Sequence, residues 1–112
     1  MKNRTWREVA TEKMADPKAA AAYLKVALEE YERDGDVSVL LIAIRTVVNA
    51  QGGIGALAKA TGLNRQTLYR TLGGKHSPRL DTLSAILNFC GLSLSLKPAK
   101  KATLETFSTT NL

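Results

Sequence analysis

The sequence predicts an all-α fold of five or six helices with a short C-terminal strand. Three observations lead to this class. Apolar residues recur every three to four positions along most of the chain, which is the period of an amphipathic helix. Glycines follow these segments where helices are expected to end. One stretch alone alternates apolar and polar residues as a strand does. Residues 1–97 are therefore interpreted as a single helical domain, and residues 98–112 as a flexible tail.

The first half of the chain predicts three helices. Residues 4–14 have the pattern of a short one. A longer helix over residues 17–35 follows, because Asp16 can accept from the first free N–H groups and Pro17 fits the first helical position. Residues 37–51 form the third. Their apolar face is broad, which places this helix near the centre of the core.

The second half predicts three shorter helices, over residues 54–61, 64–72 and 80–91. Gly62 turns the chain between the first two, and the glycines at 73–74 stop the second. Leucines at a clean three-four spacing define the last helix. These segments, added to the earlier ones, complete the five or six helices of the predicted fold.

Residues 92–96 alternate strictly between leucine and serine, which is the period of a strand. An isolated strand cannot satisfy its backbone, so it must pair with another part of the chain, a second copy or a partner protein. No other segment has a good strand pattern, which favours a second copy or a partner. The predicted dimer contact is therefore the last helix together with Leu92, Leu94 and Leu96.

Composition and charge narrow the function classes. No apolar run approaches the roughly 20 residues that a membrane-spanning helix needs. The N-terminus lacks a signal-peptide pattern and there is one cysteine, which suits a cytoplasmic protein. Residues 1–40 carry a net charge of −1 and residues 41–112 a net charge of +7. Such a basic half attracts nucleic acid, although a merely solvated basic surface explains the charge equally well.

Residues 54–73 have the spacing of a helix-turn-helix, in which Ala58 allows close packing and Gly62 makes the turn. Three leucines anchor the second helix in the core: Leu63, Leu68 and Leu72. The polar side chains left on its outer face are Asn64, Arg65, Gln66, Tyr69 and Arg70. A recognition helix presents such side chains to base edges in the major groove, where Arg can bind guanine and Gln can bind adenine.

Residues 54–97 resemble the phage-repressor-type (Cro/C1, Xre-like) helix-turn-helix domain. The positions that match its pattern are Leu57-Ala58, Gly62-Leu63, Thr67-Leu68, Arg70, Gly74-Lys75, Pro78 and Leu83. Leu72 departs from it, since the family often has Glu there. The longer stretch of residues 14–97 is similar to the probable addiction-module antidote proteins, the small HigA-like antitoxins. This resemblance implies an antitoxin that neutralises a RelE/ParE-type toxin and represses its own operon as a homodimer.

The resemblance also implies roles for individual residues on operator DNA. The expected base readers are Arg65, Gln66 and Arg70. The expected contacts to phosphate or to the edge of the site are Asn64, Thr67, Tyr69, Lys75, His76 and Arg79. Phosphate contacts set the register and carry no sequence information. A homodimer would present two recognition helices to half-sites about one helical turn apart.

Other readings of the sequence stay open. The acidic run at residues 29–36 is either a solvated helix end or a docking surface for a basic toxin. Residues 1–50 either bind the toxin or only complete the core. Trp6 and Tyr23 are either core residues or partner anchors. The alternative function is a free-standing dimeric Xre-like repressor without a toxin.

No enzyme and no cofactor are expected. His76 is the sole histidine and Cys90 the sole cysteine, whereas a zinc site needs about four ligands. Cys90 lies on an apolar helical stripe and is interpreted as a core residue. Paired carboxylates, a phosphate-binding glycine loop and a Ser/His/Asp arrangement do not stand out.

Overall fold

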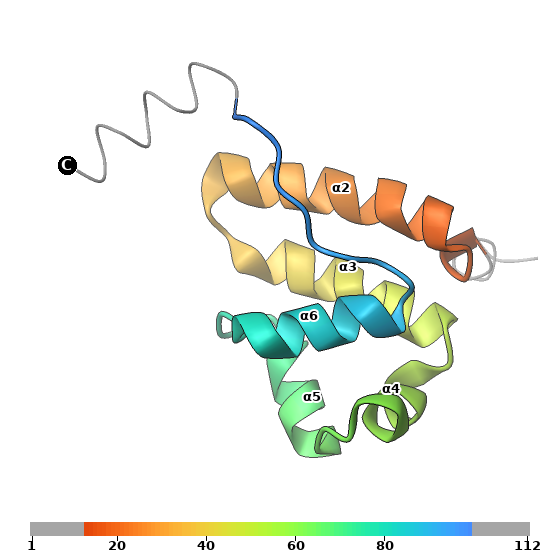
Figure 1. Ribbon diagram of the computed structural model, residues 1–112. Coiled ribbons are helices and arrows are strands. Elements are labelled where there is room, and N and C mark those ends of the chain that lie inside the picture. Colours follow the sequence, from red (N-terminus) through yellow and green to blue (C-terminus); the bar gives the residue numbers. More distant parts are fainter. Residues whose placement is uncertain (1–12, 100–112) are drawn as a thin grey trace, which may run out of the picture.

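The computed structural model describes residues 13–99, and this part of the chain is all-helical (Figure 1). The helices in chain order are α2 (Pro17–Asp34), α3 (Val37–Ala50), α4 (Gly53–Thr61), α5 (Arg65–Thr71) and α6 (Leu80–Phe89). The predicted all-α class is confirmed, and the helix boundaries fall within about two residues of those predicted. Most of the helix predicted over residues 4–14, and nearly all of the predicted tail, lie outside the described residues.

Short polar side chains begin the first two described helices. The Asp16 carboxylate accepts from the backbone N–H of Lys18 at 3.3 Å, with Pro17 in the first helical position. Asp36 begins α3 in the same way and accepts from the backbone N–H of Ser38 at 2.9 Å and from its hydroxyl at 2.6 Å. The hydroxyl and N–H of Ser38 hold the pKa of the Asp36 carboxyl below its usual range. Gly35, at φ 75°, makes the left-handed turn between the two helices.

The helices form two parts that share one core. Helices α2 and α3 run antiparallel and side by side, as an αα-hairpin (Figure 1). Helices α4 and α5 follow below them in this view, and α6 packs against α4. The arrangement leaves one side of α2, one side of α3 and much of α5 open to solvent.

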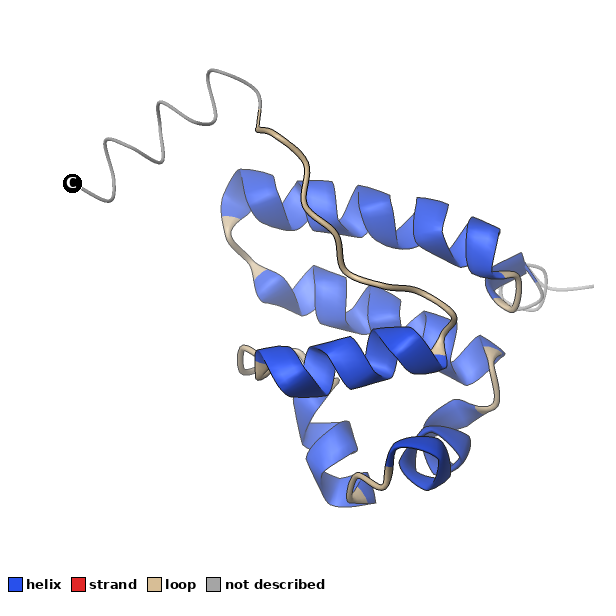
Figure 2. Cartoon of the chain, viewed as in Figure 1, coloured by secondary structure: helices blue, strands red, loops and turns tan. Residues whose placement is uncertain are grey.

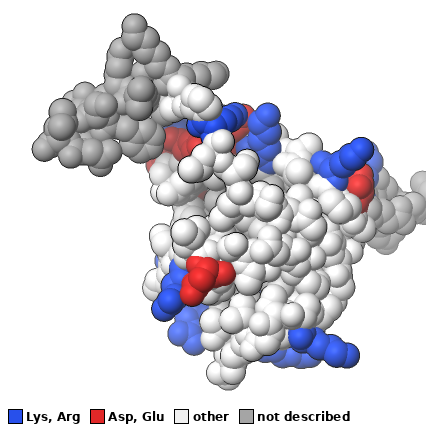
Figure 3. All heavy atoms as spheres, viewed as in Figure 1, with Lys and Arg blue, Asp and Glu red and all other residues white. Residues whose placement is uncertain are grey.

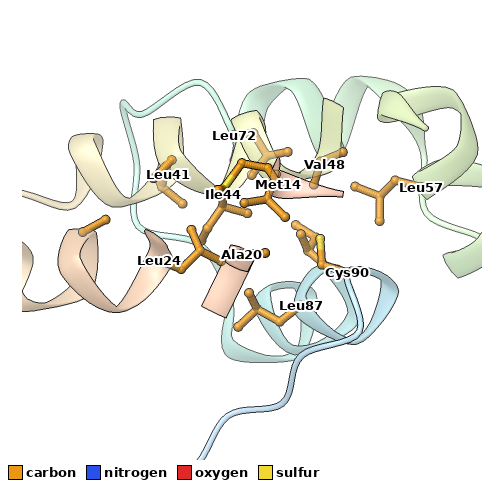
Figure 4. Packing of buried hydrophobic residues seen from close by; sticks show 14 of the residues in the cluster. Met14, Ala20, Leu24, Leu41, Ile44, Val48, Leu57, Leu72, Leu87 and Cys90 are labelled. Carbon is orange, nitrogen blue, oxygen red and sulfur yellow. The ribbon is translucent and has the colours of Figure 1, made fainter. Parts of the chain in front are cut away.

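The core has α3 at its centre, as its broad apolar face predicted. Leu41, Ile44, Val47 and Val48 of this helix are each no more than 1% exposed. Side chains from the other described helices surround them (Figure 4). The buried residues from α5 and α6 and their ends include Leu68, Leu72, Ile86, Leu87 and Cys90. Burying a side chain of this size stabilises the fold by roughly 1.5–3 kcal/mol, so α3 ties the hairpin to α4, α5 and α6.

Gln51 joins three distant parts of the chain at the end of α3. Its side-chain amide donates to the backbone carbonyl of Met14 at 3.4 Å and to that of Cys90 at 3.1 Å. The chain also approaches closely nearby, because a Cβ on Gly91 would lie 3.2 Å from Cγ of Pro17. The start of α2 and the end of α6 are therefore held together beside the end of α3.

Residues 92–99 form neither a helix nor a strand in the single described chain (Figure 2). Leu92 packs against the core, whereas Leu94 is 49% exposed and Leu96 is fully exposed. A strand here was expected to pair with a second copy or a partner protein. The single chain does not test that pairing, and the strand stays a prediction.

No single helix within residues 13–99 is long and apolar enough to span a membrane. Helices α3 and α4 taken together have the length and composition of such a span, but the chain bends by 89° between them.

Candidate nucleic-acid interface

The turn between α4 and α5 is short and well supported by hydrogen bonds. Gly62 has φ 74°, and its N–H donates to the carbonyl of Ala58 at 2.9 Å. The Thr61 hydroxyl donates to the carbonyl of Leu57 at 2.7 Å and accepts from the N–H of Leu63 at 3.2 Å. These bonds fix the direction in which the chain leaves α4, and so they fix where α5 begins.

One side of α5 is buried and the other is exposed, as its sequence pattern predicted. Leu68 and Leu72 are buried in the core, and Leu63 before the helix is partly buried. The exposed polar residues of this helix are Arg65, Gln66, Tyr69 and Arg70, while Thr67 is half-buried. Tyr69 keeps 51% of its surface in solvent. The structure therefore places all the expected base-reading side chains on one short, solvent-facing helix.

Asn64 begins α5, a structural role that differs from the predicted contact with DNA. Its side-chain carbonyl accepts from the N–H of Gln66 at 2.7 Å, and it lies 3.4 Å from the N–H of Thr67. Asparagine is among the residues most favoured at this position of a helix. The sequence contained this signal, since Asn directly precedes the first residue of the recognition segment.

Arg65 lies across the first turn of α4, a contact that the sequence analysis missed. A Cβ built on Gly55 would lie 2.7 Å from Nη2 of Arg65, closer than real Cβ atoms come, so the flexible guanidinium would have to shift. The missing side chain of Gly55 therefore makes room for the guanidinium group. Glycine within a helix lowers its stability, so an interior glycine is a sequence signal for such a close approach.

The loop after α5 carries the remaining predicted phosphate contacts. Lys75 and His76 are exposed in it. Arg79 is also exposed, and its guanidinium makes two bonds to Asp81, from Nε at 3.2 Å and from Nη2 at 3.1 Å. This guanidinium and, next, the N–H of Thr82 hold the pKa of the Asp81 carboxyl below its usual range. Arg79 thus presents a partly neutralised charge, which sequence charge counts could not reveal.

Basic side chains gather near α4 and α5. On the face shown in Figure 3, Lys and Arg atoms lie at the lower left and along the bottom, near the place of these helices in Figure 1. Further groups lie along the upper part beside acids, and most of the face is uncharged. Between residues 53 and 79 there are five Lys or Arg residues and no acid. The acidic run of residues 29–36 belongs instead to the end of α2 and the turn into α3. The acid-free basic stretch and the acid-rich run therefore lie on different elements.

Cys90 lies in the core, as its place on an apolar stripe predicted. It is fully buried at the end of α6, and burial raises the pKa of its thiol to about 11. Thiolate, the reactive form, is scarce at neutral pH under these conditions. Within residues 13–99, no three His, Cys, Asp or Glu side chains cluster as a metal site requires.

Comparison with known proteins assigns the chain to a family. The family model for probable addiction module antidote proteins matches residues 7–98, which is most of the chain. The chain belongs to this family, and the expected resemblance is confirmed. No curated protein and no solved structure matched the chain. An antidote acts against a toxin, so membership implies a toxin partner in general terms.

Proposed function

We propose that this antidote represses its own operon by binding operator DNA as a homodimer, and that it neutralises a RelE/ParE-type toxin by direct contact. The observation that carries the DNA-binding half is the exposed face of α5. Arg65, Gln66 and Arg70 lie there, on a helix fixed to the core by Leu68 and Leu72. A helix anchored in this way can enter the major groove without rearrangement of the fold.

The roles proposed on DNA follow from position. Arg65, Gln66 and Arg70 read base edges, while Thr67 and Tyr69 contact the edge of the site. Lys75 and His76 hold backbone phosphates from the exposed loop after α5. Arg79 and Asn64 contribute less, because one is paired with Asp81 and the other caps α5.

The test is a double substitution, Arg65→Ala with Gln66→Ala, measured against the promoter of the module and against scrambled DNA at one fixed salt concentration. Each lost bidentate base contact should weaken promoter binding by about 1–3 kcal/mol, with little effect on scrambled DNA. Lys25→Ala, on α2, removes a cation far from α5 in the chain and serves as the control. Promoter affinity and preference equal to those of the unsubstituted chain would refute the base-reading role.

The proposed homodimer uses the exposed leucines after α6. Leu94 and Leu96 are open to solvent in the single chain, whereas Leu92 already packs against the core. Leu94→Asp with Leu96→Asp should therefore convert a dimer into a monomer without loss of helix content. Light scattering gives the mass and circular dichroism gives the helix content. A variant that remains dimeric would move the dimer contact elsewhere.

The toxin-binding half rests on family membership and on the outer surface of the first two described helices. Helix α3 supplies the centre of the core, so residues 1–50 cannot be removed without unfolding the rest. Completing the core and binding a partner are nevertheless compatible, since α2 and α3 each keep exposed apolar side chains outside the core.

A further inference from the structure

An apolar groove lies between α2 and α3, on the side of the hairpin that does not form the core. It has a volume of about 340 Å³. Tyr23, Val26 and Glu30 line it from α2, Val39 and Ile42 line it from α3, and two alanines form its floor. Among these side chains Glu30 carries the only charge. The groove is therefore a continuous apolar surface with one acidic group.

The apolar side chains of the groove are unusually open to solvent. Val26 is 60% exposed, Ile42 55%, Val39 50% and Tyr23 38%. Single exposed apolar residues are common, but a contiguous group of them marks a surface that another molecule covers. These side chains form one row on each helix, and the trough between the two rows can accept a ridge of apolar side chains from a partner.

The end of the groove next to the turn between α2 and α3 is acidic. Residues 29–36, at the end of α2 and the turn into α3, contain five acids and a single cation, Arg33. Arg33 pairs with Glu30 at 3.1 Å, which leaves the other acids of this run to face solvent. An acidic end beside an apolar trough favours a partner with cations beside its apolar side chains. It also disfavours DNA, whose phosphates carry the same sign of charge.

A second copy of this chain fits the groove less well. A symmetric pair of copies brings the same patch of both subunits together. Each patch would contribute residues 29–36 with their excess of acids, and neither copy would bring a Lys or Arg that lines the groove. Charge thus favours a different, basic protein as the occupant.

We infer that the groove between α2 and α3 is the docking surface for the toxin, a basic protein that inserts an apolar ridge flanked by lysine or arginine. This inference rests on the proposed antitoxin function and specifies its binding surface. The proposed DNA-reading residues lie on α5, which is a separate element. The toxin and the operator can therefore occupy the chain at the same time.

The experiment is a calorimetric titration of the full-length chain with the purified toxin of its own module. Val26→Asp and Ile42→Asp place a carboxylate in the apolar trough at exposed positions, which the fold tolerates. Each should raise the dissociation constant at least roughly 30-fold, equivalent to about 2 kcal/mol. Leu28→Asp is the matched control, since Leu28 is also on α2 and 41% exposed but does not line the groove. It should change the dissociation constant less than about threefold.

A second measurement follows the contact without disrupting it. Ile42→Cys introduces an exposed thiol, whereas the native Cys90 is buried and unreactive, so a fluorescent label reports on position 42 alone. The emission of the label should shift when toxin is added at concentrations that saturate the calorimetric titration. Circular dichroism melting confirms that each variant is folded.

The outcomes separate the docking surface from the antitoxin function. If the unsubstituted chain binds the toxin and the groove variants bind it equally well, the groove is not the docking surface and the antitoxin function stands. If groove variants change the mass of the assembly and leave toxin affinity intact, the groove lies between copies of the chain and the inference is overturned. If the unsubstituted chain does not bind the toxin at all, the antitoxin function and the inference both fall.

Discussion

Substitutions of Asn64 can distinguish a role in capping α5 from a role in contacting DNA. Its side-chain carbonyl accepts from the N–H of Gln66 at 2.7 Å, while the second candidate bond, to Thr67, is long at 3.4 Å. One good bond therefore begins α5, a helix of seven residues with few bonds of its own. Asn64→Ala should lower the free energy of unfolding by about 1 kcal/mol. For a domain of this size that corresponds to a fall in Tm of about 4–8 °C.

Asn64→Ser is the informative companion, because serine keeps an oxygen that caps the helix but has no amide to donate to DNA. Its Tm should stay close to that of the unsubstituted chain. Promoter affinity then distinguishes the roles: loss in both variants assigns a DNA contact to the amide, and loss in Asn64→Ala alone assigns the effect to the position of α5. Thermal melting by circular dichroism and promoter titration are the two assays. An Asn64→Ala variant that melts with the unsubstituted chain would refute the capping argument.

Three further predictions rest on the described contacts. Gly55→Ala should displace the guanidinium of Arg65 and weaken promoter binding. The Tm should stay equal or rise, since Ala favours a helix. Unchanged promoter affinity would show that this contact is irrelevant to DNA binding. The thiol of Cys90 should resist a thiol reagent at pH 8 until urea unfolds the chain, and rapid labelling of the folded chain would contradict its burial. The free energy of unfolding should fall as the pH rises from 9.0 to about 11, because the thiol ionises first in the unfolded chain. Ile44→Ala should lower the free energy of unfolding in urea by about 2–5 kcal/mol, because the side chain is buried. Ile42→Ala, at an exposed position, should change it by no more than about 0.5 kcal/mol. Equal effects would contradict the assigned packing of α3.

Much of the fold was predictable because its signals are local. Asp16 and Pro17 mark the start of α2, and Gly35 and Gly62 mark turns that need a positive φ. Such signals act over one or two turns of helix and do not depend on the rest of the chain. The exposed side of α5 was predictable for a similar reason. Once Leu68 and Leu72 face the core, helical geometry sends the polar residues outward.

Contacts between elements were not predictable in the same way. The approach of Arg65 to Gly55 depends on the angle between α4 and α5. The bridge from Gln51 to the carbonyls of Met14 and Cys90 spans more than 35 residues in each direction. Charge counts and periodicity contain no information about such distances.

The α2–α3 hairpin shows most clearly which features the sequence determines and which depend on the tertiary structure. By itself the sequence determined that residues 37–51 form an apolar helix. Its match to the family model also determined that the chain belongs to the antidote family. Helical spacing also determined that Ile44 faces the core and that Ile42 lies on the same stripe as Ser38, Arg45 and Asn49. It did not determine whether another element would cover Ile42. In the folded chain Ile44 is buried, whereas Ile42 stays exposed and lines the same groove as Val26. Only the packing of α2 beside α3 brings these exposed side chains together as a groove, because exposure depends on what every neighbouring element covers.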